Sequence, residues 1–404
     1  MFAEIHNDRA LRIFGALLAL AHGLTALHWA FAQPLAAILA PQNWPAICWP
    51  PFPDCAAAHN FTPMQVEIAL WALGLASLVV AALFLLQKSA VASVSLGLLA
   101  IVKLSIVMLD YRLRLNQHMM TAWLVAAFLL VPQKRRVLTG LIVAIYFWAG
   151  VLKLTPEWLN GSALYGRLPL PTALLAPACW YVVVLELVLI FGLLARQRWL
   201  FWLTMAQLLL FHAVSLPVVS FFYPALMLLI LAFLPLCRAI APPLLQAPLW
   251  PAAATLGAFS ALQLVPLTFP GDVLLTGEGR LWALHMFDAP LECQAWLTPH
   301  AADGRSGAPT PLRVAMLSNR VLCDPLVYAS ASRGICARNA GRVGVLDLHL
   351  QSRRAGEAAY HAVMDVPDVC AQPLKYSLLR HNPWIQSGET RRPAQPGVPE
   401  LRGR

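Results

Sequence analysis

The stretch YFWAGVLKLTPEWLNG, residues Tyr146–Gly161, decides how this chain is organised. It closes an apolar run that starts near Val137, and Thr155-Pro156 predict the end of that helix. Lys153 lies inside the run, just before this stop. A lysine at that depth of a membrane span is costly and indicates a functional site. The alternative is an anchor whose ammonium group extends to the nearby membrane surface.

Composition places the chain among multi-pass membrane proteins. Hydrophobic residues make up 59% and charged residues 12% of the sequence, whereas a soluble domain carries about twice that share of charge. We therefore expect a mostly α-helical, polytopic bundle of about nine spans in a lipid bilayer. The predicted spans are Leu11–Phe31, Val66–Leu86, Val91–Leu109, His118–Val131, Val137–Leu154, Leu174–Leu194, Leu200–Val214, Val218–Leu236 and Leu249–Leu267.

Basic residues predict the orientation of the bundle. Much of the formal net charge of +10 lies in short loops, where it sets topology, so we predict no nucleic-acid partner. With the N-terminus in the cytoplasm, the basic residues of the inner loops are Lys88, Lys134, Arg135, Arg136, Arg196, Arg198 and Arg238. An odd number of spans then places the C-terminal region outside the cytoplasm, as in the periplasm of a bacterial inner-membrane protein.

Cysteines supply an independent indication of sidedness. Six of the eight cysteines fall in segments predicted to lie outside: Cys48, Cys55, Cys293, Cys323, Cys336 and Cys370. An even set there is typical of disulfides in an oxidising compartment, although the sequence leaves their pairing open. Buried free thiols or a metal site are alternatives, but no C-x-x-C spacing occurs, so we predict no metal.

The pattern changes from about Gly271 onward, where charges rise and short alternating runs appear. Residues 1–270 are the predicted transmembrane domain, and residues 271–386 are a small extracytoplasmic domain rich in strands. The predicted strands are Leu291–Leu297, Val343–Leu350 and Ala359–Val366, with a turn at Asp303–Gly307. Residues 387–404 are rich in Pro, Gly and Arg and are predicted to be a disordered tail.

Isolated polar residues gather at the predicted outer face of the bundle. They are Lys153, Asp110, Asn116, His118 and His212. Each has an ordinary interpretation, since Asn116 can cap a helix, Asp110 can pair with a nearby arginine, and a lone histidine near a helix end is usually a hydrogen-bonded interface residue. Together they predict an outward-opening cavity suited to acid–base chemistry on an amphipathic substrate.

Two further charged residues lie deeper in the predicted bundle. Lys103 and Glu186 each stand alone in an apolar run and could pair with each other, but the sequence does not show which partner each one takes. A transporter would need polar residues through the full depth of the membrane, whereas here most of them gather at one face.

The segment AGVLKLTPEWLNG, Ala149–Gly161, resembles the signature helix end of the vitamin K-dependent gamma-carboxylase family. Bacterial members share it as the horizontally transferred transmembrane (HTTM) domain. Three further stretches resemble the family in the same order: Asn116–His118, then Phe211-His212 with Ser220–Met227, then Glu278–Trp282 with Met286-Phe287.

The resemblance implies an enzyme of the lyase or epoxidase type. Lys153 would be the catalytic base, assisted by His118 and His212, while Asn116, Trp148 and Asp110 would contact the cofactor. That cofactor would be a reduced, vitamin K-like quinone used with O2 and CO2. The expected activity is quinone-linked oxygenation or epoxidation, or modification of a peptide. The alternative is a non-catalytic membrane module for the maturation, export or immunity of a secreted peptide, with that peptide or a partner protein bound by the outer domain.

Overall fold

The computed structural model describes residues 2–40, 46–52, 55–165, 168, 170–240, 249–281, 283–284, 291–300, 305–315, 321–339, 345–354 and 356–402. The chain divides into two compact units. The helical unit comprises Met1–Ala36, Pro63–Ile106 and Leu115–Leu262. The sheet unit comprises Ala37–Thr62, Val107–Arg114 and Gln263–Arg404. The sheet unit therefore includes two loops that the predicted boundary at residue 270 assigned to the transmembrane domain.

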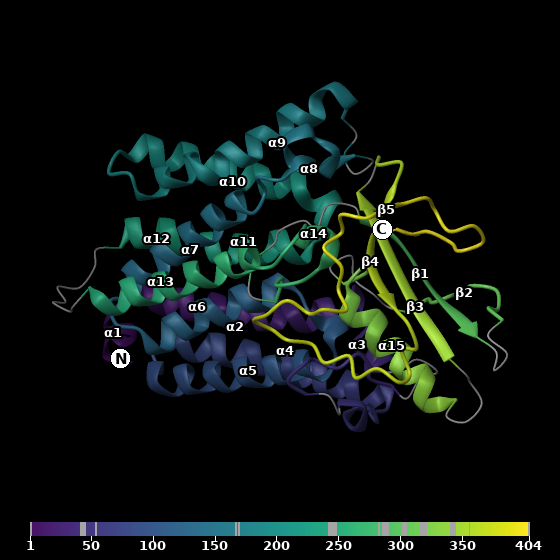
Figure 1. Ribbon diagram of the computed structural model, residues 1–404. Helices are drawn as coiled ribbons and strands as arrows, with labels where there is room; N and C mark the ends of the chain where they lie inside the picture. The colour runs from purple at the N-terminus through teal and green to yellow at the C-terminus, as the bar shows by residue number, and fades with distance from the viewer. Residues whose placement is uncertain are drawn as a thin grey trace. The chain divides into compact units, whose positions relative to one another are not determined.

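Helices of the helical unit are shown in Figure 1. They are α1 (Phe2–Asn7), α2 (Arg9–Phe31), α4 (Pro63–Leu85), α5 (Ser89–Leu109), α6 (Asn116–Leu130), α7 (Lys134–Val151), α8 (Pro156–Asn160), α9 (Thr172–Leu187), α10 (Arg198–Val219), α11 (Phe222–Leu231), α12 (Phe233–Ala239) and α13 (Trp250–Leu264). Their starts follow local chemistry. Asp8 caps α2 by accepting hydrogen bonds from the backbone N–H groups of Ala10 and Leu11.

Seven helical segments in the described part of the chain are long and apolar enough to cross a membrane. They are Arg9–Phe31, Pro63–Leu85, Ser89–Leu109, Thr172–Leu194, Arg198–Val219, Phe222–Ala239 and Trp250–Thr268. The fourth and fifth predicted spans also form helices, but α6 has only 15 residues and α7 begins with three consecutive cations. Because seven and nine are both odd, either count puts the segments before the first crossing and after the last on opposite sides.

Large apolar side chains remain exposed along the outer helices of this unit. Trp71 on α4, Leu98 on α5, Trp199 on α10 and Trp250 on α13 are examples. A soluble protein rarely exposes so many large apolar groups, whereas a hydrocarbon environment stabilises them. The exposed apolar residues therefore agree with helices that contact lipid.

Small residues set the packing of α2 on α4. A Cβ atom added at Gly15 would lie 2.8 Å from the ring of Phe84, and one at Gly23 would lie 3.4 Å from Cβ of Ser77. These glycines lie eight residues apart and so share one helix face. Close approach through small residues is the usual way in which membrane helices associate.

The sheet unit is built around antiparallel strands. In Figure 1 these are β1 (Leu291–His300), β3 (Val345–Arg354) and β4 (Tyr360–Val366), flanked by β2 (Thr310–Pro311) and β5 (Arg391–Arg392). The order is β2-β1-β3-β4-β5, and β6 (Leu401–Arg402) also pairs with β1. The three predicted strands are confirmed as the long strands, although Val343 and Gly344 lie outside the described residues, as do Asp303 and Gly304 of the predicted turn.

Two segments of the sheet unit differ from the predictions. Pro325–Arg338 forms a helix, α15, which packs against β3. Residues 387–402, predicted to be disordered, instead complete the sheet, since β5 pairs with β4 and β6 pairs with β1. Two ion pairs join this segment to the long strands, since Arg392 pairs with Asp365 of β4 at 2.6 Å and Glu400 pairs with Arg353 of β3 at 2.5 Å.

Three disulfides join the six cysteines that were predicted to lie outside: Cys48–Cys55, Cys293–Cys323 and Cys336–Cys370. All three belong to the sheet unit, and the alternatives of free thiols or a metal site are therefore wrong for these residues. Cys179 and Cys237, both in the helical unit, are free. This distribution agrees with an extracytoplasmic position for the sheet unit.

Candidate functional site

Lys153 occupies the turn that ends α7. The helix stops at Val151, before the predicted end of the span at Leu154, and Thr155-Pro156 start the short helix α8. In this turn the N–H of Lys153 donates to the carbonyl of Gly150 at 3.1 Å. Lys153 is only 1% exposed. The surface-anchor alternative is therefore wrong, because the ammonium group is covered by protein.

Glu186 of α9 is the ionic partner of Lys153. Nζ of Lys153 lies 2.5 Å from Oε2 of Glu186 and 5.3 Å from the centre of the Trp158 ring. Glu186 is completely buried, and its Oε1 has no hydrogen-bond partner among the described residues. Of the two lysines that the sequence offered as partners, Lys153 rather than Lys103 pairs with Glu186.

Gly150 allows this ion pair to form. A Cβ atom at Gly150 would lie 2.9 Å from Cβ of Glu186 and 3.1 Å from Leu187. Real Cβ atoms do not tolerate the first distance, so only glycine permits α7 and α9 to approach this closely. Helix packing therefore explains why a glycine stands three residues before Lys153.

Tyr146 and His212 lie in the same neighbourhood. The hydroxyl of Tyr146 is 2.6 Å from Nε2 of His212, and both side chains are buried. Lys153 acts electrostatically on His212, and Glu186 acts on Tyr146. We call Lys153, Glu186, Tyr146 and His212 the lysine cluster.

His118 has a different set of contacts. Its ring lies 5.3 Å from that of Trp29 and 6.0 Å from that of Phe222. His28 stacks on Phe222 at 4.3 Å, whereas the next residue, Tyr223, contacts His212 at 5.4 Å. Consecutive rings at the start of α11 thus face two different histidine environments. His212 therefore lies within electrostatic range of Lys153. His118 instead lies near Trp29 and the two histidines of α2, His22 and His28.

Asn116 and Trp148, two residues predicted to contact a cofactor, have separate surroundings. Asn116 is buried as the first residue of α6, and Leu115 rather than Asn116 holds the capping position. The indole N–H of Trp148 donates to Oγ of Ser260 on α13 at 2.9 Å. The indole N–H of Trp148 is therefore used by α13, whereas Glu186 lies on α9.

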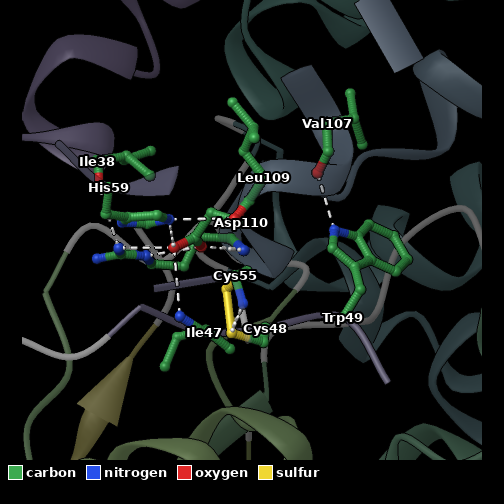
Figure 2. Close-up of a disulfide and its surroundings, with 10 residues drawn as sticks. Ile38, Ile47, Cys48, Trp49, Cys55, His59, Val107, Leu109 and Asp110 are labelled. Carbon is green, nitrogen blue, oxygen red and sulfur yellow. Dashed lines mark hydrogen bonds and ion pairs between the residues drawn. A yellow bond between two sulfur atoms is a disulfide. The ribbon is translucent and has the colours of Figure 1, made fainter. Parts of the chain in front are cut away.

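Asp110, the third such residue, belongs to the sheet unit. Figure 2 shows its carboxylate with His59 and Ile47, near the Cys48–Cys55 disulfide. Arg112 donates to it from its backbone N–H at 2.8 Å and from its guanidinium at 2.8 and 2.9 Å. The N–H of Ile47 donates at 3.3 Å, and Nε2 of His59 lies 3.4 Å away. Both carboxylate oxygens thus have a full set of donors. Two of these donors, Ile47 and His59, belong to residues 37–62, so Asp110 holds that segment in place.

A second buried carboxylate extends this structural network. Asp324 caps α15 by accepting from the N–H of Leu326 at 3.0 Å, and it accepts a hydrogen bond from Tyr111 at 2.8 Å. Burial raises the pKa of Asp324, and Arg280 and Arg114 oppose that rise. Asp110 and Asp324 therefore tie the loops of residues 37–62 and 107–114 to the rest of the sheet unit.

Within the described ranges, no group of three or more His, Cys, Asp or Glu side chains is arranged to hold a metal ion. Searches against models of protein families, curated proteins and solved structures find no match to this chain. Trp282, Met286 and Phe287, which contribute to the sequence resemblance, lie outside the described residues.

Sequence reasoning missed Glu186 and Tyr146 as members of the lysine cluster. Glu186 carried a usable signal, since a lone carboxylate in an apolar run needs a cation. Two cations, Lys103 and Lys153, could meet that need, and sequence spacing could not choose between them. Tyr146 gave no signal, because an aromatic residue near a span end is common.

Proposed function

We propose that this chain is a multi-pass membrane enzyme in which Lys153 acts as a base, within the gamma-carboxylase-like superfamily that it resembles. The observation that supports the proposal most is the buried Lys153–Glu186 pair, which lies within electrostatic range of the hydrogen-bonded residues Tyr146 and His212. Ionisable groups inside membrane bundles are rare and usually functional. The segment Ala149–Gly161 contributes the resemblance that names the superfamily.

The ion pair supplies a way to make the amine reactive. Lys153 and Glu186 have zero net charge as an ammonium–carboxylate pair, and also as an amine with a carboxylic acid. Moving the proton from Nζ to Oε2 across 2.5 Å leaves a neutral amine that can take a proton from a substrate. Glu186 would therefore hold the proton while Lys153 acts. His212, fixed by Tyr146, would donate a hydrogen bond to a developing anion.

A quinone-like cofactor fits the groups of the lysine cluster. Oε1 of Glu186 and Nδ1 of His212 are buried without hydrogen-bond partners among the described residues. Oε1 can accept a hydrogen bond from a hydroxyl group, and a protonated Nδ1 can donate one to a hydroxyl or carbonyl oxygen. The rings of Trp158 and Tyr223 offer flat apolar surfaces next to Lys153 and His212. A reduced quinone would supply an acidic hydroxyl and reducing equivalents for O2, as the family resemblance implies, with CO2 as a further substrate.

Sidedness follows from the disulfides and the basic loops. The sheet unit would lie in the periplasm of a bacterial inner-membrane protein, where its three disulfides are stable. The N-terminus would lie in the cytoplasm, together with the cations that begin α7. A cysteine reporter placed after Gly388 is then labelled from outside intact cells.

The catalytic proposal is tested by turnover of a reduced quinone in purified membranes. Replacing Lys153→Met removes the amine while keeping its length, and we expect turnover to fall by about 100-fold or more, the usual range for a lost general base. Lys88→Met, which changes an exposed lysine before α5, is the matched control and leaves turnover unchanged. Unchanged turnover in Lys153→Met would contradict a catalytic role for this amine.

A non-catalytic membrane module is the second candidate. One observation favours it, because Lys153 is already neutralised by Glu186, as a purely structural ion pair would be. A secreted peptide that co-purifies with the protein and is retained by the double variant Lys153→Met/Glu186→Leu would support this alternative.

A further inference from the structure

A second buried polar cluster lies in the helical unit, centred on Lys103 of α5. The neighbouring residues Ile101 and Val102 are exposed on the outside of α5, whereas Lys103 is only 1% exposed. The lysine therefore points into the bundle from a helix whose other face carries exposed apolar residues. Nζ of Lys103 has no hydrogen-bond partner among the described residues.

Histidines rather than carboxylates interact electrostatically with Lys103. It lies close enough to His22 of α2 and His118 of α6 to act electrostatically on both rings. Within the described ranges, no aspartate or glutamate forms an ion pair with it. Lys153 differs in this respect, because Glu186 neutralises it. In its protonated form, Lys103 would thus be a buried cation without a counter-ion among the described residues, which is a costly arrangement.

The remaining groups of this cluster supply mainly hydrogen-bond donors. Nδ1 of His22 lies 2.9 Å from the carbonyl of Leu18, so that nitrogen carries the proton and Nε2 is an acceptor. The indole N–H of Trp29 and both ring nitrogens of His118 are buried and unpartnered among the described residues. Trp29 and His118 are completely or almost completely buried and lie next to each other.

Two arrangements could lower the free-energy cost of this buried cluster. They differ in whether the hydrogen-bond donors of Trp29 and His118 gain an acceptor. Lys103 could lose its proton, which removes the charge but leaves the N–H groups of Trp29 and His118 unsatisfied. An anion with several acceptor lone pairs would satisfy the ammonium group and these donors together. The second arrangement gives an acceptor to Nζ of Lys103, to the indole N–H of Trp29 and to the one N–H of a neutral His118 together.

We infer that Lys103, His22, His118 and Trp29 form a buried site for a monoanionic carboxylate. A single lysine calls for a single negative charge, and a carboxylate offers two oxygens with about four lone-pair positions. Nε2 of His22 remains available as an acceptor for Lys103 itself. The carboxylate could be the head group of a fatty acid from the bilayer or a small carboxylate from water. This site does not rest on the chemistry proposed for Lys153.

Binding of radiolabelled palmitate and radiolabelled acetate to the full-length protein tests this site. With protein in phosphatidylcholine nanodiscs, we expect saturable binding of one of the two probes at one site per chain. Saturable palmitate binding identifies the bilayer as the source, whereas saturable acetate binding alone identifies water. Lys103→Met should weaken binding by roughly 10- to 100-fold, the usual effect of losing a charged hydrogen bond. The matched variant Lys88→Met should bind as the wild type does.

Thermal unfolding without probe separates binding from folding. Lys103→Met should unfold at or above the wild-type temperature, because it removes an unpaired buried charge. If this variant fails to fold, Trp29→Phe removes a single N–H and should weaken binding by about 5- to 10-fold. The proposal is overturned if neither probe binds saturably, if Lys103→Met binds normally, or if a high-resolution map shows only ordered water beside Nζ of Lys103.

Discussion

Asp110 of the sheet unit and Glu186 of the helical unit are both completely buried carboxylates, but they differ in how many partners their oxygens have. In the sheet unit, Asp110 is saturated by a guanidinium group, two backbone N–H groups and a histidine. In the helical unit, Glu186 has one oxygen on Lys153 and the other without a partner among the described residues. A saturated carboxylate fixes a structure, whereas a half-satisfied one retains the capacity to accept a proton or a ligand.

The same contrast extends to the rest of each unit. The sheet unit holds its loops with three disulfides and with buried carboxylates that contact arginine and tyrosine. The helical unit instead contains nitrogens of His118 and Lys103 that have no hydrogen-bond partner among the described residues, and two free thiols. We therefore expect replacements at the buried polar groups of the sheet unit to affect mainly stability, and those in the helical unit to affect mainly function.

Asp110→Asn should have the largest effect on stability. The amide would leave the buried guanidinium of Arg112 without a counter-charge, which typically costs about 3–5 kcal/mol. Chemical unfolding of the purified protein measures this loss. Glu67→Gln, at an exposed position of α4, is the control and should stay within about 0.5 kcal/mol of the wild type. A loss below about 1 kcal/mol for Asp110→Asn would contradict a structural role for this network.

Gly150→Ala should have the next largest effect. The added methyl group would meet Cβ of Glu186 at 2.9 Å, and such overpacking typically costs about 1–3 kcal/mol. It should also separate Lys153 from Glu186 and reduce any activity that depends on the pair. Gly74→Ala is the matched control, because no atom lies within 4 Å of its added methyl group. Equal stability of the two variants would show that α7 and α9 can move apart without cost.

The double variant Lys153→Met/Glu186→Leu should cost less, within about 1.5 kcal/mol, because apolar groups of similar volume often replace a buried ion pair well. Quinone turnover should nevertheless be lost. The corresponding double variant Asp110→Leu/Arg112→Met should be clearly less stable, because the N–H of Ile47 and of residue 112 would lose their acceptor. Chemical unfolding of both double variants measures the two losses in unfolding free energy. Equal losses would contradict the difference proposed between the carboxylates of the two units.

The pH dependence of the sheet unit should show the smallest effect. At Asp365, burial raises the pKa, but hydrogen bonds from His349, Arg392 and Gln386 outweigh it, so the pKa is lowered overall. Because its pKa is lowered in the folded protein, Asp365 stabilises the fold at any pH above the pKa of an aspartate in the unfolded chain, which is about 3.9. That contribution is lost as pH falls through the lower folded value. Acid unfolding followed by near-ultraviolet circular dichroism should show Asp365→Asn to be less stable than the wild type at pH 6, with the gap narrowing below pH 4.

Much of the fold could be predicted from the sequence because hydropathy is a local property. The apolar runs and the alternating strands each depend on residues close together in the chain, and the observed elements lie near the predicted ones. Residues 391–402 escaped prediction for the opposite reason. Their composition favours disorder, and they become ordered only through partners far away in sequence, such as Arg353 for Glu400.

The candidate site could be predicted only in part. Lys153, His118 and His212 are visible in the sequence because isolated polar residues stand out in apolar runs. Which of them lie together depends on helix packing, which the sequence does not specify. The close approach of α7 and α9 at Gly150 decides that Glu186 reaches Lys153 rather than Lys103.

The pairing of β6 with β1 has a consequence for how the protein is made. Strand β1 spans residues 291–300 and its partner β6 residues 401–402, and β2 covers only the Trp296–Leu297 part of the same edge. At ~5–20 residues per second, the ribosome needs on the order of 5–20 s to reach β6 after finishing β1. The intervening edge of β1 stays open during translocation, when a neighbouring nascent chain could add a strand there. When the protein is overexpressed, we therefore expect the incompletely formed sheet of nascent chains to aggregate before the apolar helices do.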